Sequence, residues 1–96
     1  MREFKIGDIV RHFKRETLNP VDHMKNRYLY RIVAFAEHTE TGEELVIYQA
    51  LYDDFKTYAR PRSMFESEVD HEKYPDIKQK YRFEFLTGGQ REKTAR

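Results

Sequence analysis

Hydrophobic and polar residues alternate in several short stretches of this chain, with the two-residue period of a β-strand. The first stretch, 9–13, places Ile9 and Phe13 on one face of a predicted strand. The segment 14–27 has no such period, is mostly polar and contains an Asn-Pro pair, so we expect a long loop there. Loops of this length are uncommon in compact domains and are often functional.

The strongest strand prediction covers residues 28–37, which are rich in β-branched and aromatic side chains. Strict alternation would place Tyr30, Ile32, Ala34 and Ala36 on one face of this strand, and Arg31, Val33 and Phe35 on the other. Both faces are largely apolar, which is typical of a strand in the middle of a sheet.

Two turns and three further elements follow. Residues 38–42 end in a glycine that can supply positive φ, and 45–52 returns as the hairpin partner. A turn at Asp53-Asp54 leads into a third strand, 55–59, which Pro61 ends because proline cannot donate to a ladder. A helical turn is expected at 62–65 and a last strand at 81–85.

These elements predict an all-β fold, a small barrel of the SH3 type with about five strands and a helical turn before the last one. A chain of 96 residues has room for one domain, which we place at 1–86. The remaining segment, 87–96, contains Gly-Gly and several charges and is expected to be a flexible tail. Barrel closure removes exposed strand edges, so a monomer is favoured.

Composition narrows the chemistry. The chain has no cysteine, which excludes disulfides, thiolate metal sites and a cysteine nucleophile. The N-terminus lacks the apolar stretch of a secretory signal, and the longest apolar run is far too short to cross a membrane. A cytoplasmic location is the expectation.

The net charge of +1 conceals an uneven distribution. Residues 1–31 carry eight basic and four acidic side chains (+4), residues 32–86 carry seven and twelve (−5), and 87–96 carry three and one (+2). A nucleic-acid-binding surface needs a basic field, which only the N-terminal third could supply within the folded part. The candidate residues for that alternative are Arg11, Lys14, Arg15 and Arg27.

Catalytic and metal sites have weak signals. The four histidines lack the spacing of a metal site, so neither a metal nor another cofactor is expected. No serine lies in a nucleophile motif. The remaining catalytic alternative is an enzyme that uses His38 with Glu37 or Glu40 as a base.

The central hairpin resembles a known family. The run H-T-E-T-G-E-E-L-V-I-Y-Q-A-L-Y, followed by A-R-P-R-S-M-F, is similar to the signature of the bacterial domain-of-unknown-function family numbered sixteen fifty-three. The match covers about 28–69 well, and 7–27 and 81–86 more loosely. The resemblance implies an SH3-type barrel and carries no activity with it. This chain departs from the family after Tyr52, where Asp53-Asp54 and Tyr58 replace the family's frequent Gly and Trp.

Three functions follow from these observations. The leading hypothesis is a non-catalytic binding domain that recognises a protein partner or a small anionic group. Its face would be formed by Arg31, His38, Tyr48, Tyr52 and Arg60. Arginine and tyrosine are the residue types that anchor such interfaces. The alternatives are the nucleic-acid-binding surface and the His38 enzyme.

Overall fold

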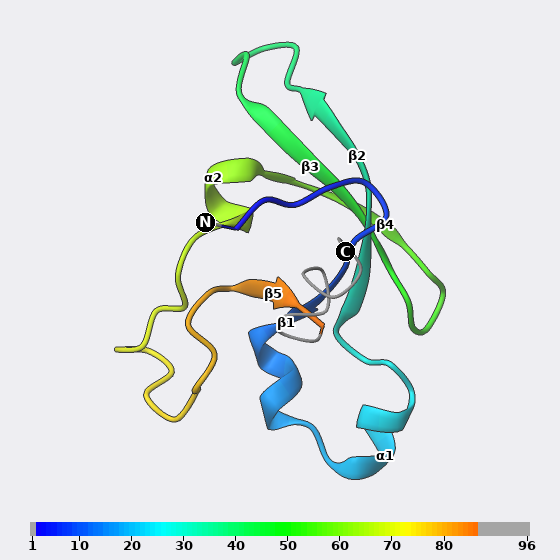
Figure 1. Ribbon diagram of the computed structural model, residues 1–96, viewed down its shortest axis with the longest axis vertical. Coiled ribbons are helices and arrows are strands. Elements are labelled where there is room, and N and C mark those ends of the chain that lie inside the picture. Colours follow the sequence, from blue (N-terminus) through cyan, green and yellow to red (C-terminus); the bar gives the residue numbers. More distant parts are fainter. Residues whose placement is uncertain (1, 87–96) are drawn as a thin grey trace, which may run out of the picture.

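Five antiparallel strands form one sheet in the computed structural model, which describes residues 2–86 (Figure 1). The strands are β1 (Ile9–His12), β2 (Leu29–Glu37), β3 (Glu44–Ala50), β4 (Thr57–Pro61) and β5 (Phe83–Phe85). Their order across the sheet is β4-β3-β2-β1-β5. The helical turn predicted before the last strand is present as α2 (Arg62–Phe65). The predicted all-β class is therefore confirmed.

The sheet curls but does not close. β4 and β5 are its two edge strands, and no ladder joins them within residues 2–86. The curl is nevertheless strong, because the guanidinium carbon of Arg60 on β4 lies 5.6 Å from the ring centre of Phe83 on β5. The structure thus shows an open five-stranded sheet, and the SH3-type barrel is not confirmed.

A bulge in β2 changes which residues face the core. Ile32 pairs with Tyr48 but Ala34 pairs with Ile47, so Val33 is the extra residue. A bulge shifts the alternation by one position. Phe35 consequently packs against the same core as Ile32, while Ala36 is exposed. The predicted grouping of Ala34 and Ala36 with Ile32 is therefore wrong.

The predicted loop at 14–27 was also wrong, because it contains two short helices. A 3₁₀ helix, η1 (Phe13–Thr17), begins after His12, whose Nδ1 accepts a hydrogen bond from the backbone N–H of Lys14 at 3.1 Å. The helix α1 (Pro20–Met24) begins after Asn19, whose side chain accepts a hydrogen bond from the Asp22 N–H at 2.9 Å. Asparagine before proline is a standard helix start.

The main core lies on the concave side of the sheet. Phe65 of α2 stacks on Phe83 of β5, with ring centres 4.1 Å apart and planes at 6°. Tyr30 and Tyr48 pack edge-on against the Phe83 ring at 5.8 and 5.4 Å. Aromatic contacts of this kind hold α2 and β5 against the inner face of β2 and β3.

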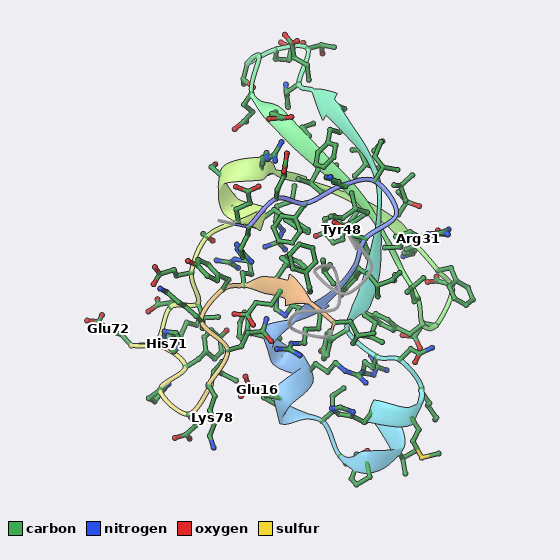
Figure 2. The ribbon with its side chains drawn as sticks, in the orientation of Figure 1. Glu16, Arg31, Tyr48, His71, Glu72 and Lys78 are labelled. Atoms are coloured by element: carbon green, nitrogen blue, oxygen red, sulfur yellow. The ribbon has the colours of Figure 1, made fainter. Side chains whose placement is uncertain are left out.

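A second, smaller core fixes the segment between α2 and β5. Phe13, Val69 and Ile77 are buried together, and Tyr74 packs on Phe13 with ring centres 4.9 Å apart. The Glu16 carboxylate accepts hydrogen bonds from the backbone N–H groups of residues 78 and 79, at 2.9 and 2.6 Å. These contacts attach the 69–79 segment to η1, at the end of the molecule away from the β2–β3 turn (Figures 1 and 2).

Two further sequence expectations concern the C-terminal tail and membrane-spanning segments. The predicted flexible tail at 87–96 lies outside the described residues. Within 2–86, none of the helices has the length and apolar character needed to cross a membrane.

Candidate anion-binding pocket

A cavity of about 270 Å³ lies where the two edges of the sheet approach one another. Its walls come from four parts of the chain: the end of β1 with η1, β4, the 69–79 segment and the residue before β5. The lining residues, here called the cationic pocket, are His12, Phe13, Lys14, Arg60, Asp70, Lys73, Tyr74 and Arg82. Four of these eight side chains are cations and one is an anion.

The two arginines of the cationic pocket are held in the same way. Arg60 Nε donates to the Tyr48 hydroxyl at 3.2 Å, and Arg82 Nε donates to the Ser67 hydroxyl at 3.3 Å. Neither guanidinium has a hydrogen bond from its two Nη atoms to any residue of 2–86. Each arginine is thus fixed at Nε and keeps its Nη fork available, which is the geometry that binds the oxygens of a phosphate or carboxylate.

The two lysines are exposed, and the single carboxylate is engaged locally. Asp70 accepts hydrogen bonds at Oδ1 from the backbone N–H groups of Glu72 and Lys73, at 3.1 and 3.3 Å. Asp70 therefore shapes the turn that presents Lys73 and Tyr74. Among residues 2–86, Lys14 and Lys73 have no ion pair with any carboxylate.

His12 provides a neutral donor in the wall. Burial, and to a lesser extent the positive charges of Arg60, Lys14 and Arg82, together lower the pKa of His12 to about 3. Since Nδ1 accepts a hydrogen bond from Lys14, the proton of the neutral ring belongs on Nε2. The ring is packed against Phe13 and Phe83 at 4.4 and 5.0 Å, which fixes its orientation.

Ion pairs occur elsewhere in the described part of the chain. Arg11 pairs with Glu84 at 3.3 Å, Arg27 with Asp53 at 3.6 Å, and Arg62 with Glu66 and Glu44 at 2.8 and 3.0 Å. None of these pairs includes a residue of the cationic pocket. The pocket therefore concentrates positive charge that has no ion pair within residues 2–86, in a chain whose net charge is +1.

The predicted binding face is not assembled as one surface. Tyr48 is only 4% exposed and supports Arg60 from inside, whereas Arg31 points to solvent at the outer side of the sheet (Figure 2). His38 lies at the β2–β3 turn, where its Nδ1 accepts from the N–H groups of residues 40 and 41 at 3.0 and 3.3 Å. Of the five predicted residues, only Arg60 lines the cationic pocket.

Tyr52, the fifth member of that predicted face, has an internal partner. Its hydroxyl lies 2.7 Å from that of Tyr30. Burial raises the pKa of both phenols, so both stay neutral at physiological pH.

The predicted nucleic-acid-binding residues are mostly engaged as well. Arg11 uses all three nitrogens, on Gln79 at 3.0 Å, the Leu86 carbonyl at 2.9 Å and Glu84 at 3.3 Å. Arg15 donates to the carbonyls of Arg27 and His23, at 2.8 and 3.1 Å. Arg27 pairs with Asp53. Only Lys14 of this set lines the cationic pocket.

Arg11 and Arg15 do line a second cavity of about 300 Å³, together with Glu16, His23, Gln79 and Leu86. Its arginine donors are the ones already directed at protein acceptors, and its glutamate is held by two backbone N–H groups. This cavity is a place where β1, η1 and the 69–79 segment are joined, and it offers an anion few unused donors.

Sequence reasoning missed Arg82, Lys73 and Tyr74 as pocket residues. The alternation of 81–85 does place Arg82 on the face opposite Phe83. No local pattern, however, indicates that this arginine meets one from β4, because their approach depends on the curl of the whole sheet. Lys73 and Tyr74 lie in a segment that has no strand or helix period.

The histidines and carboxylates do not converge on a metal site. Across residues 2–86, no group of three or more His, Asp or Glu side chains is placed to hold a metal ion. The cavity beside the β2–β3 turn is lined by Phe35, Ala36, Glu37, Gly42 and Glu44, and His38 is not among its walls.

The fold and the pocket together define a small antiparallel β domain with a cation-lined cavity between its sheet edges. The family described as protein of unknown function (DUF1653) matches residues 8–85, which is most of the chain. The chain belongs to this family, as the resemblance of its hairpin had indicated. No curated protein and no solved structure matches the chain.

Proposed function

We propose that this protein is a non-catalytic binding domain that recognises a small anionic ligand in the cationic pocket. The observation that carries the proposal is the set of four cations, Lys14, Arg60, Lys73 and Arg82, which have no ion pair among residues 2–86. Unpaired arginines that are partly buried and fixed at Nε are costly to maintain for structure alone. They fit an anion that completes their hydrogen bonds.

The anionic-ligand hypothesis from the sequence is kept, with a different set of residues. Arg60 remains its centre, Tyr48 becomes the support of Arg60, and Lys14, Lys73 and Arg82 join it. The nucleic-acid alternative has less support because Arg11, Arg15 and Arg27 donate to internal acceptors. The His38 alternative has less support because that imidazole caps a turn. A bacterial, cytoplasmic setting stays a prediction of the sequence.

The proposal is tested by calorimetric titration of the protein with inorganic phosphate at low ionic strength. A charge-assisted hydrogen bond contributes about 1.5–3 kcal/mol, so Arg60→Gln should weaken binding by roughly tenfold to a hundredfold. The matched control is Arg31→Gln, which removes an exposed arginine outside the pocket. Its affinity should stay within about twofold of the wild type, since the change removes no ligand contact.

Salt provides a second readout. An anion held by several cations should bind less tightly as the concentration of sodium chloride rises, because salt screens the attraction between the charges. If wild-type protein takes up no phosphate at low salt, or if Arg31→Gln weakens binding as much as Arg60→Gln, the pocket is not the site and the proposal is wrong.

A further inference from the structure

We propose that the ligand of the cationic pocket is a phosphate monoester, a terminal phosphate group, in preference to a phosphodiester or a carboxylate. This inference rests on the proposed function and specifies the chemical class of its ligand. It is carried by the charge balance of the pocket, by the two arginine forks and by the aromatic part of the wall.

The charge balance favours a dianion. The lining holds Lys14, Arg60, Lys73 and Arg82 against Asp70, and the imidazole of His12 is neutral, so the excess is three positive charges. A phosphate monoester carries about −1.5 to −2 at pH 7, whereas a diester or a carboxylate carries about −1. A monoester therefore neutralises about half to two thirds of the excess, whereas a diester or a carboxylate neutralises about one third.

The donor geometry also favours a terminal phosphate. Arg60 lies on β4 and Arg82 lies immediately before β5, and each keeps both Nη atoms free of protein acceptors within 2–86. Because both arginines line one cavity, their forks would offer four N–H-bearing nitrogens to a ligand held there, and the two lysines would add two more. A terminal phosphate presents three equivalent oxygens to such a set, while a diester or a carboxylate presents only two charged oxygens.

The wall has an apolar part that suits the group carrying the phosphate. Phe13 is buried, and the half-buried Tyr74 packs on it at 4.9 Å beside Lys73. Both rings line the same cavity as the cations. A planar base could stack on such a ring, as bases do on aromatic side chains in other binding sites. The phosphate could therefore be carried by a nucleotide or by a sugar, and the two sources are separated by experiment.

The test compares four ligands by calorimetric titration of the wild-type chain: methyl phosphate, dimethyl phosphate, ribose 5-phosphate and adenosine 5′-monophosphate. We expect methyl phosphate to bind at least tenfold more tightly than dimethyl phosphate. Adenosine 5′-monophosphate binding tenfold more tightly than ribose 5-phosphate would identify a nucleotide as the source. Equal binding of these two would identify the phosphate as the recognised group, and both outcomes support the monoester.

A substitution at an exposed position tests the charge of the pocket without disturbing the packing of the fold. Lys73→Gln removes one positive charge from a solvent-exposed side chain. Because a dianion is attracted to that charge more strongly than a monoanion, the ratio of methyl phosphate affinity to dimethyl phosphate affinity should fall several-fold. Equal affinities of methyl and dimethyl phosphate in the wild type would overturn the monoester while leaving anion binding intact. Binding of none of the four ligands would overturn the proposed function itself.

Discussion

Arginines in two neighbouring regions of this domain have opposite surroundings. In the first region, Arg11, Arg15 and Arg27 direct their donors at carboxylates and backbone carbonyls, and they join β1, η1, α1 and β5. In the second, Arg60 and Arg82 each donate a hydrogen bond only from Nε within the described chain, and both line the cationic pocket. The difference teaches that the arginines divide into a set with internal acceptors and a set whose Nη atoms have none within the described chain, which composition does not reveal.

The largest expected effect is the loss of folding stability when an arginine of the first region is replaced. Arg11→Ala removes three hydrogen bonds in a partly buried setting, one of which is also the ion pair with Glu84. We expect the free energy of unfolding to fall by about 2–3 kcal/mol, measured by urea denaturation. Arg60→Gln should lower it by less than about 1 kcal/mol, since that guanidinium has one internal hydrogen bond.

Phosphate affinity should show the reverse order for these two variants. Folded Arg11→Ala protein should bind phosphate as the wild type does, while Arg60→Gln should bind it far more weakly. A similar loss of affinity in both variants would contradict the division into two regions.

The next effect tests the buried, cation-rich surroundings of His12 through the stability of the protein in acid. The pKa of His12 is lowered from 6.5 to about 3 in the folded state, mainly by burial and further by Arg60, Lys14 and Arg82. The unfolded chain therefore binds a proton at His12 below pH 6.5 that the folded chain does not bind until about pH 3. Stability is lost as pH falls through this window, by about 2 kcal/mol between pH 7 and pH 5.

His12→Phe keeps an aromatic ring at this position and removes the titrating group. Its unfolding free energy should fall by about 2 kcal/mol less than that of the wild type between pH 7 and pH 5, although loss of the cap to Lys14 makes it less stable at pH 7. Parallel pH profiles for the two proteins would show that neither burial nor the neighbouring cations lower the pKa of His12 in the folded state.

The smallest of these effects concerns how Arg60 is positioned. Tyr48→Phe removes only the hydroxyl that accepts from Arg60 Nε, and the ring remains in the core. We expect phosphate binding to weaken by about threefold to tenfold, in line with roughly 1 kcal/mol for one hydrogen bond.

Tyr30→Phe is the matched control, because it removes a hydroxyl that contacts Tyr52 and not Arg60. Its affinity should be unchanged. Equal weakening by the two substitutions would indicate a general loosening of the core, and Tyr48 would then have no specific role in positioning Arg60.

Much of the fold could be predicted from local pattern. The hairpin, the Asp53-Asp54 turn and the helical turn at 62–65 follow from strand propensity, turn chemistry and proline, which act over a few residues. The bulge at Val33 could not be predicted, because it depends on pairing with β3 and on the fit of Phe35 to the core. The two short helices could not be predicted from an apolar period, because Phe13 is the one buried residue of η1 and α1 has none.

The candidate site was predicted only in fragments. The sequence singled out Arg60 as one member of a binding face and Lys14 as one member of a basic surface, and these side chains line one cavity. Their meeting depends on the curl that brings β4 beside β5, which is a long-range property of the sheet. Arg82 follows from the same curl, and Lys73 depends on the small core around Phe13 that fixes the 69–79 segment.

The most direct test follows the arginine side chains themselves. In a ¹⁵N-labelled wild-type protein, the Nε–Hε resonances can be recorded during titration with inorganic phosphate at low ionic strength. If Arg60 and Arg82 bind the anion, their resonances should shift and saturate together, while those of Arg11 and Arg62 stay in place. Uniform small shifts of all four, or shifts of Arg11 and Arg62 without Arg60 and Arg82, would contradict the claim that the cationic pocket is the binding site.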